Sequence, residues 1–385
     1  MKIESLHGDV GDCISVANSS GTVVRSTLAK RCSEYCGKYE QSKRNIKLDI
    51  LKGIAIFCMV WGHVIQYGTA NGLDFFENPI FQFIYSFHMP LFMIISGYLA
   101  YTSIHKRRIL QQWIHWGRTL LIPLISWTFI AYFIYNLALF IVKGSLERIA
   151  FSPMLYWFII SLIVCGVIAT LVKFLFNDSI IVYTLIEIVL IVTTINVFNI
   201  GWMFPFFMAG YLINNYSQKS KLIFDRVCTA CLFLFPILMM FYSSGTYSYL
   251  SGGLLMDFLS GTLSSMSFVE YGGVVLHNVY KLLTGFAGCG FLYCVVEKML
   301  QINIPIVTAT FAWFGKESLN IYLISVVIVS LLFGRLLSLF NITNIVIYDF
   351  LITLPIAIIT TLLITYIGRI LHKNRIINMI LLGGR

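Results

Sequence analysis

The segment that decides the fold is residues 48–67, LDILKGIAIFCMVWGHVIQY, in which a few polar residues interrupt an apolar run. About 20 such residues let an α-helix cross the hydrocarbon core of a membrane. Lys52 and His63 are eleven residues apart, which at ~100° per residue comes within about 20° of three full turns, so both project from nearly the same face, about 16 Å apart along the axis. Ionisable groups inside a membrane helix are costly to bury and usually face a polar cavity or a partner. The segment therefore predicts a membrane helix with a polar track along one side.

The composition of the whole chain agrees with a membrane protein. Hydrophobic residues make up 58% of the 385 residues and charged residues 11%, and the mean hydropathy of +0.83 is far from that of soluble proteins. We therefore expect an all-α, polytopic membrane helix bundle of about ten transmembrane helices, with the long ninth run broken near Gly315. The expected helices are about 48–67, 80–101, 119–142, 154–175, 180–198, 201–214, 226–243, 271–296, 309–340 and 345–367.

The basic residues predict the orientation of this bundle. If the N-terminus is cytoplasmic, the outer loops contain only Lys143 and Arg148, and most of the remaining Lys and Arg lie before the first helix and in the inner segments. The inner cations after the first helix include Lys106, Arg107, Arg108, Arg118, Lys219, Lys221, Arg226, Arg369, Lys373, Arg375 and Arg385. This positive-inside asymmetry, with an even number of helices, places both termini in the cytoplasm. It also explains the net charge of +10 by topology and contact with anionic membrane lipids, so no nucleic acid partner is expected.

The chain divides into two tails and a transmembrane domain that contains one long polar interruption. Residues 1–43 are rich in Ser, Lys, Gly and Cys and lack the apolar core of a signal peptide, so we expect an uncleaved, flexible cytoplasmic tail. A transmembrane domain is expected at 44–371 and a short cytoplasmic tail at 372–385. The longest polar interruption, about 243–270, combines aromatic, hydroxyl and glycine residues, which suit either a carbohydrate-binding surface or an ordinary exposed loop.

The nine cysteines do not form a recognisable metal-binding pattern. Cys32 and Cys36 fall in the N-terminal tail, and Cys228 and Cys231 have no histidine or second cysteine pair near them in the sequence. A structural zinc site needs four ligands, and the spacing assembles none. We expect reduced, structural cysteines and no metal cofactor.

Two motifs resemble a known family. Residues 44–56, RNIKLDILKGIAI, closed by Val60-Trp61-Gly62-His63, place ten residues between a cation and a histidine, and residues 87–98 read FHMPLFMIISGY. They resemble the first and second helices of the membrane-integral acyltransferase-3 family, which O-acylates sugars and other hydroxyl compounds. Lys52 before the glycine, where other members have Arg, resembles the fucose 4-O-acetylase-like branch. Weaker similarities, at Arg118 with Pro123 and at 156–158, 204–211 and 315–323, extend the resemblance from about residue 44 to the C-terminus.

The chain departs from the family pattern at two places. The family often has Arg-x-x-Arg at the start of the third helix, whereas this chain has His115-Trp116-Gly117-Arg118. Because histidine is only partly charged near neutral pH, the contribution of His115 to anion binding is in doubt. Many relatives also have a histidine in the ninth helix where this chain has Ser325, so that position cannot supply a base.

The resemblance implies an acetyl-CoA-dependent membrane O-acetyltransferase acting on a surface polysaccharide, such as an O-antigen, or on a lipid-linked glycan. It would lie in the bacterial inner membrane, beside the machinery that assembles surface polysaccharides. Such a reaction needs a base for the attacking hydroxyl, and a histidine pKa suits that role. His63 is the candidate base, as the resemblance also implies, and Lys52 and His88 are the further candidates for catalytic residues. The phosphates of the donor would dock on cytoplasmic cations, for which Lys52, Arg107, Arg108, His115 and Arg118 are the candidates.

Each candidate residue also has a structural interpretation. Lys52 would simply extend toward the cytoplasmic interface or pair with Asp49, three residues earlier. His63 would be a hydrogen-bonded interior histidine, His88 would bond a carbonyl freed by Pro90, and Arg118 would only set the topology. Ser96-Gly97 fits close helix packing better than a cavity. Four further ionisable residues lie in or near apolar runs and are weaker candidates, namely Glu187, His277, Lys281 and Arg335.

Two other classes of function fit the same composition. A membrane transporter or flippase for a small solute or glycan lipid would also bury charges, although we find no inverted repeat in the sequence. A membrane receptor or assembly subunit without catalytic activity is the third class. Dependence on an acetyl donor distinguishes the enzyme from both.

Overall fold

Helices make up all regular secondary structure in the part of the chain that the structure describes. This computed structural model describes residues 45–68, 75–143, 153–192, 197–216, 221–243, 268–302, 304–329 and 347–384. Internal contacts divide the chain into residues 1–46 and 47–385, and the description below concerns the second unit. The predicted tail at 1–43, most of the segment 243–270 and Arg335 lie outside the described residues.

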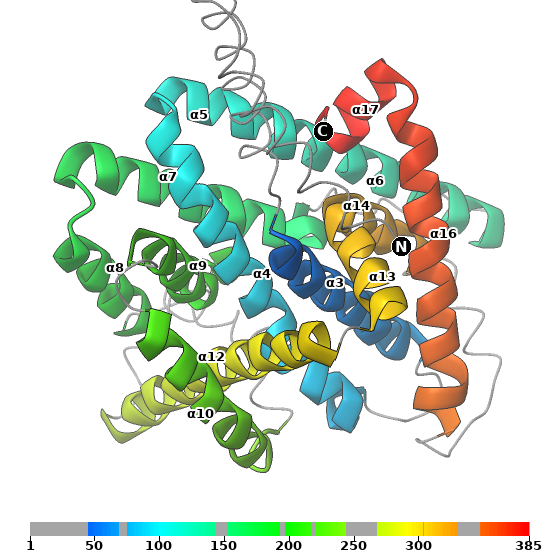
Figure 1. Cartoon of the computed structure of the whole chain (residues 1–385). Helices are drawn as coiled ribbons and strands as arrows, with labels where there is room; N and C mark the ends of the chain where they lie inside the picture. Colours follow the sequence, from blue (N-terminus) through cyan, green and yellow to red (C-terminus); the bar gives the residue numbers. More distant parts are fainter. Residues whose placement is uncertain are drawn as a thin grey trace, which may run out of the picture. The chain divides into compact units, whose positions relative to one another are not determined.

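The described helices follow one another along the chain in the order that Figure 1 shows. In order they are α3 (Ile46–Gly68), η2 (Phe75–Glu77), α4 (Pro79–Lys106), α5 (Ile109–Trp116), η3 (Gly117–Leu121), α6 (Ile122–Lys143), η4 (Pro153–Tyr156), α7 (Trp157–Phe176), α8 (Ile180–Val192), η5 (Val197–Asn199), α9 (Ile200–Tyr216), α10 (Lys221–Met239), α12 (Phe268–Ile302), α13 (Pro305–Lys316), α14 (Ser318–Ile328), η11 (Ile347–Thr353), α16 (Leu354–His372) and α17 (Arg375–Leu382). The elements η3 and η11 are π-helical turns.

The helices confirm the all-α membrane architecture. Seven helices in the described ranges are long and apolar enough to cross a membrane, and eight are if the pair α13–α14 counts as one span. The helices α8 and α9 are shorter, with 13 and 17 residues. Each of the ten predicted segments contains helix, and the third begins earlier than predicted, at Ile109. The number of ten membrane spans and the cytoplasmic location of both termini remain predictions.

The predicted break near Gly315 lies two residues further on, at Glu317. There the axes of α13 and α14 bend by 77°. The side chain of Asn320 donates a hydrogen bond of 2.6 Å to the Glu317 carboxylate. His372, at the end of α16, lies 3.4 Å from the same carboxylate. The bend is therefore tied to the end of α16 by polar side chains.

Glycines bring two pairs of helices into backbone contact. A methyl group at Gly97 of α4 would overlap the carbonyl oxygen of Phe207 in α9, and one at Gly210 of α9 would overlap the carbonyl oxygen of Ile94 in α4. The Asn214 side chain donates a hydrogen bond of 2.6 Å across the same contact, to the carbonyl of Tyr98. Small residues permit this close approach between membrane helices. The prediction that Gly97 serves helix packing is confirmed.

The same arrangement joins α3 to α13. A methyl group at Gly53 would overlap the carbonyl oxygen of Phe311, and one at Gly315 would overlap the carbonyl oxygen of Asp49. Because residue 49 faces 315 and residue 53 faces 311, the two helices run antiparallel at this crossing. The first helix is therefore held by backbone contact beside Lys52.

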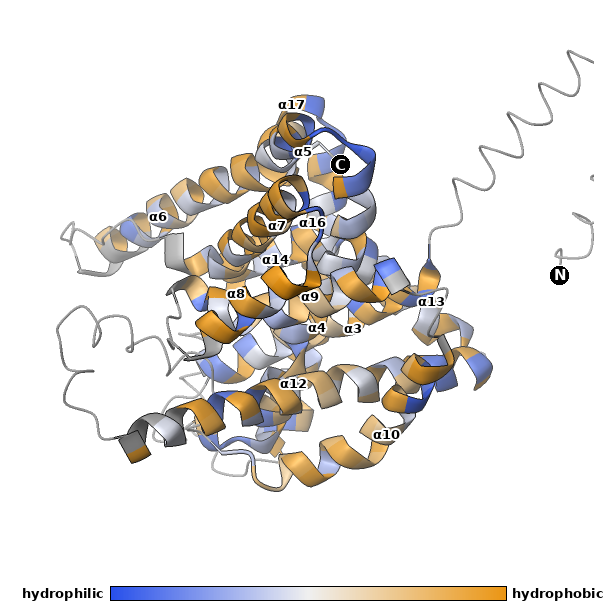
Figure 2. Ribbon diagram, turned by 90° about the vertical axis from the view of Figure 1, so that its left-hand side faces the viewer, coloured by the Kyte–Doolittle hydropathy of each residue, from blue (hydrophilic) through white to orange (hydrophobic). Residues whose placement is uncertain are grey.

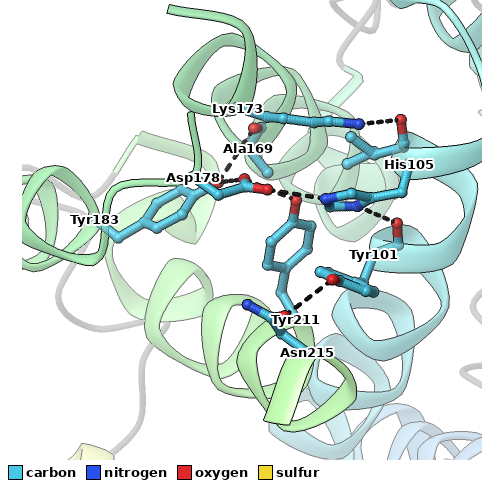
Figure 3. Close-up of polar contacts among 9 residues, drawn as sticks. Tyr101, His105, Ala169, Lys173, Asp178, Tyr183, Tyr211 and Asn215 are labelled. Atoms are coloured by element: carbon cyan, nitrogen blue, oxygen red, sulfur yellow. Dashed lines mark hydrogen bonds and ion pairs between the residues drawn. The ribbon is translucent and has the colours of Figure 1, made fainter. Parts of the chain in front are cut away.

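A carboxylate holds the turn between α7 and α8 against two other helices (Figure 3). Asp178 accepts hydrogen bonds from the hydroxyl groups of Tyr183 (2.9 Å) and Tyr211 (3.0 Å). His105, at the end of α4, lies 2.9 Å from its second oxygen through Nε2 and donates from Nδ1 to the carbonyl of Tyr101. Asp178 has a left-handed backbone, with φ of 58°. This polar cluster fixes the α7–α8 turn beside the end of α4.

Large apolar side chains also cover much of the surface. The ribbons of α6, α7, α8 and α10 are hydrophobic along most of their length, as Figure 2 shows. Phe133, Phe233 and Met240, for example, are 67%, 73% and 81% exposed. A soluble protein does not leave such extensive apolar surface in water, so these faces fit contact with lipid.

The segment predicted as a C-terminal tail contains the helix α17. Asn374 caps the start of this helix by accepting hydrogen bonds from two backbone amides, those of Ile376 and Ile377. Trp127 of α6 donates from its indole to the carbonyl of Leu381, at 2.9 Å. Gly383 has a φ of +77° and lies against the backbone of Thr119. The end of the chain therefore packs on the π-helical turn that carries Arg118.

Replacing Gly97 with alanine should destabilise the protein, because the new methyl group has no room beside Phe207. Overpacking of this kind typically costs about 1–3 kcal/mol. The control is Gly273→Ala in α12, where a methyl group meets nothing within 4 Å. Alanine also has the higher helix propensity there. Thermal unfolding of both variants in detergent, followed by size exclusion, measures the difference, and equal midpoints would contradict the tight crossing.

Candidate active site

His63 lies in the C-terminal half of α3 and is partly buried. Its Nδ1 atom is 3.0 Å from Oε1 of Gln66, one turn further along the same helix. The hydroxyl group of Tyr85, on α4, is 3.3 Å from the same nitrogen. The rings of Tyr67 and Tyr85 have their centroids 5.9 and 6.2 Å from that of the imidazole. Neighbours from α3 and α4 therefore hold the imidazole on its Nδ1 side.

His88 lies on the other side of Tyr85, with ring centroids 4.6 Å apart. It is only 1% exposed. Its Nδ1 donates a hydrogen bond of 2.8 Å to the carbonyl of Ile84, one turn earlier in α4. Pro90 deprives the Ser86 carbonyl of its usual donor, so His88 bonds a different carbonyl from the one that the proline frees. We call His63, Gln66, Tyr85 and His88 the histidine cluster.

Gly62 makes the contact between α3 and α4 in this cluster possible. A Cβ atom at this position would lie 2.6 Å from Cε2 of the Tyr85 ring. Any other residue would therefore displace the ring, and with it the hydroxyl group that reaches His63. The Trp-Gly-His sequence places the glycine where the aromatic ring needs the space.

A polar network that sequence reasoning missed begins at Trp61, two residues before the histidine. Trp61 donates from its indole to the hydroxyl of Thr353, at 2.9 Å. Asn78 donates to the carboxylate of Asp349, at 2.8 Å, and both side chains are 3% exposed. Asp349 sits inside the apolar run 345–367, so the rule that singled out Lys52 could have singled it out as well. This network joins α3, the start of α4 and η11.

Lys52 forms an ion pair within its own helix. Its Nζ is 2.9 Å from Oδ1 of Asp49, and the two side chains are 18% and 4% exposed. The predicted pairing of these two residues is confirmed. The same helix, α3, continues unbroken from Lys52 to His63, so the two residues keep the shared face that the spacing predicts. The ammonium group is therefore neutralised locally, beside the crossing of α3 with α13.

The predicted donor-binding cations lie on the connection from α4 to α6. Arg107 and Arg108 are exposed, and Arg107 hydrogen-bonds to the hydroxyl of Ser103. Arg118 is exposed on the π-helical turn η3, and His115 is partly buried at the end of α5. This segment packs on α7, because the Trp116 ring fills the space beside Gly166. We call residues 106–118 the basic segment. The guanidinium groups of Arg107, Arg108 and Arg118 in this segment are accessible.

The other candidates lie elsewhere. Lys281 is 3% exposed inside α12, and His277, one turn earlier on the same helix, is partly buried. Glu187 is partly buried in α8. Ser325 is buried and donates a hydrogen bond to the carbonyl of Tyr322, at 3.0 Å. The structure therefore places His63 and His88 in contact with the same tyrosine, Tyr85. It pairs Lys52 with Asp49 of the same helix. The arginines lie apart from both, on the α4–α6 connection.

Within the described ranges, no group of three or more His, Cys, Asp or Glu side chains is arranged to hold a metal ion. Six cysteines in those ranges are free thiols. Cys228 and Cys231 of α10 face the neighbouring helix, where Gly290 of α12 leaves room for the Cys231 side chain. Their geometry is that of helix packing.

Comparison with known proteins gives the family. The model of the acyltransferase-3 family, described as an acyltransferase domain, matches residues 45–370. The chain belongs to the acyltransferase-3 family. The protein is therefore an acyltransferase, and its apolar helices make it an integral membrane protein.

Two curated relatives of this acyltransferase have the same name. Nodulation protein NolL of Mesorhizobium japonicum (strain LMG 29417 / CECT 9101 / MAFF 303099) is 25% identical over 303 residues, which are 74% of this chain and 76% of the relative. Nodulation protein NolL of Sinorhizobium fredii (strain NBRC 101917 / NGR234) is 31% identical over 212 residues, 50% of this chain and 57% of the relative. No solved structure matches the acyltransferase.

Removing the charge of Lys52 should destabilise the acyltransferase, because the buried Asp49 carboxylate would lose its cation. Breaking a buried ion pair on one side typically costs about 3–5 kcal/mol. The double variant Lys52→Met/Asp49→Asn removes both charges and should be more stable than Lys52→Met alone. Thermal unfolding of wild type, both single variants and the double variant completes the cycle. Additive losses would show that the pair does not couple.

Proposed function

We propose that this membrane acyltransferase moves an acetyl group from acetyl-CoA to a hydroxyl group of a glycan, with His63 as the general base. The observation that supports this role is the pair of contacts on Nδ1, from Gln66 and Tyr85. They hold a partly buried imidazole on one side and leave Nε2 as the nitrogen for the substrate. The family match supports the reaction class.

The proposed reaction needs one proton carrier. The hydroxyl oxygen of the acceptor attacks the thioester carbon while Nε2 of His63 takes the hydroxyl proton. The resulting tetrahedral intermediate collapses, the carbon–sulfur bond breaks, and the leaving thiolate takes the proton back from the imidazolium. The products are the acetyl ester and coenzyme A, and His63 is neutral again. Nearby donors would stabilise the oxyanion of the intermediate.

His88 is the weaker base of the two histidines. It is 1% exposed and is bonded to a carbonyl of its own helix. It packs against the Tyr85 ring, which also contacts His63. We therefore assign His88 to positioning Tyr85 rather than to proton transfer.

The donor would bind at the basic segment. The phosphates of acetyl-CoA match the guanidinium groups of Arg107, Arg108 and Arg118, since arginine binds phosphate through paired hydrogen bonds. His115 would add charge only when protonated, and Lys52 would contact the donor as part of its ion pair with Asp49. The thin pantetheine arm would then follow the shared face of α3 toward His63.

The acceptor would enter from the opposite, outer side, because His63 lies in the half of α3 away from the basic residues. We propose a surface polysaccharide or a lipid-linked glycan as acceptor and the bacterial inner membrane as location. The assembly machinery for surface polysaccharides is the proposed partner. The bend between α13 and α14 also occurs as a feature of transporters, but a transporter would not need an acetyl donor.

Substituting His63 with alanine should reduce acetyl transfer at least 100-fold, since general base catalysis typically contributes 10²–10⁴-fold. The matched variant His88→Ala should lose much less, because it changes only the support of Tyr85. Transfer of radiolabelled acetyl from acetyl-CoA to glycan, in membranes holding equal amounts of folded protein, measures both. A larger loss in His88→Ala would reverse the assignment.

The same assay in sealed vesicles tests the side of entry. Acceptor confined to the outer side should be acetylated by donor on the cytoplasmic side. Product formed only from cytoplasmic acceptor would contradict the proposed route without contradicting the role of His63.

Neutralising the basic segment should weaken donor binding and leave the chemical step intact. The triple variant Arg107→Gln/Arg108→Gln/Arg118→Gln should raise KM for acetyl-CoA about 10-fold with little change in kcat, since each exposed ion pair is worth about 0.2–1 kcal/mol. The control is Arg226→Gln, an exposed cation on α10, which should leave KM unchanged. An equal KM in the triple variant and wild type would place the donor elsewhere.

A further inference from the structure

Gln66 is the residue that contacts the proposed base most closely. Its Oε1 lies 3.0 Å from Nδ1 of His63, and the three-residue spacing on α3 places the two side chains as neighbours on the helix surface. Amide oxygens only accept hydrogen bonds, so the hydrogen between these atoms belongs to the imidazole. A neutral imidazole with its hydrogen on Nδ1 carries its lone pair on Nε2.

A second donor fixes the same amide oxygen. The hydroxyl group of Tyr85 lies 3.4 Å from Oε1 of Gln66 and 3.3 Å from Nδ1 of His63. Phe81 stacks on the Tyr85 ring, with centroids 3.8 Å apart, and Gly62 leaves room for that ring. The three polar groups therefore form a closed triangle that α4 supports through packed aromatic rings.

We propose that Gln66 is a positioning residue that fixes the Nδ1–H tautomer of His63 and directs Nε2 toward the reacting hydroxyl. This assignment rests on the proposed role of His63 as base. Gln66 touches neither substrate and exchanges no proton. It acts by keeping the basic nitrogen in one place. A displacement of about 1 Å in a catalytic group can reduce the rate 10²-fold.

The neutrality of Gln66 has a consequence for pH dependence. A carboxylate in its place would accept the same Nδ1 hydrogen bond but would stabilise the imidazolium form of His63 by its charge. The variant Gln66→Glu should therefore retain the tautomer and shift the acid limb of the rate profile to higher pH. Tyr67 and Tyr85, whose rings contact this imidazole, and His88, which contacts the Tyr85 ring, are unchanged in that variant.

The test compares Gln66→Leu, Gln66→Glu and a matched control. Gln66→Leu should lower kcat about 10- to 100-fold with KM for acetyl-CoA unchanged, because donor binding does not involve Gln66. Gln66→Glu should recover much of the loss, with the shifted profile. The control is Gln82→Leu, which removes a glutamine that bonds the carbonyl of Phe76 instead of a histidine, and it should keep the wild-type kcat.

A spectroscopic measurement separates this proposal from the proposed function. In protein labelled with ¹⁵N-histidine, the His63 signals, assigned by their loss in His63→Gln, should show hydrogen on Nδ1 in wild type and a mixture of tautomers in Gln66→Leu. Hydrogen on Nε2 in wild type, or unchanged signals in Gln66→Leu, would overturn the role of Gln66. If the signals behave as expected but His63→Gln keeps full activity, the proposed base is wrong while the hydrogen bond from His63 to Gln66 stands.

Discussion

Close contact between helix backbones is the constraint on which the rest of the structure depends. In a membrane the lipid is as apolar as the side chains, so helices associate through close packing and hydrogen bonds. Here the contact is reciprocal, with Gly97 facing Phe207 and Gly210 facing Ile94, and likewise with Gly53 and Gly315 at the other crossing. Each pair of glycines allows a single register. These crossings fix α4 on α9 and α3 on α13, and the contact of Gly62 with the Tyr85 ring joins α3 to α4 near His63.

Polar groups that would otherwise be buried without partners reinforce these crossings. The Asn78–Asp349 and Trp61–Thr353 hydrogen bonds join three elements at one end of α3. The cluster around Asp178 ties the α7–α8 turn to α4 and α9, as Figure 3 shows. A carboxylate that is removed from water requires hydrogen-bond donors, so the buried Asp349 and the partly buried Asp178 each fix the geometry of the helices around them. Apolar packing alone would specify that geometry less well.

Sequence reasoning predicted the features that depend on residues close together in the chain. Hydrophobic length predicted α3 within two residues, because an apolar run in lipid has no alternative to helix. The bend near Gly315 and the Lys52–Asp49 pair also depend on residues a few positions apart. The third helix began ten residues earlier than predicted, because α5 carries glutamines that lower its apolar signal.

Contacts between distant residues were beyond such reasoning. Asn78 and Asp349 are 271 residues apart in the chain, and Tyr85 reaches His63 from another helix. The spacing of Gln66 from His63 was visible, but its meaning depends on Tyr85 and Gly62. Under the proposed function, α3 carries one charged pair, Lys52 with Asp49, and one neutral pair, His63 with Gln66. Lys52 is balanced by a charged neighbour near the basic residues, where an anionic donor would be attracted, and His63 is held by a neutral amide in the other half of α3. Since a neutral amide leaves the basicity of the imidazole to its surroundings, proton transfer there would create the imidazolium together with the oxyanion of the intermediate, two opposite charges that offset each other.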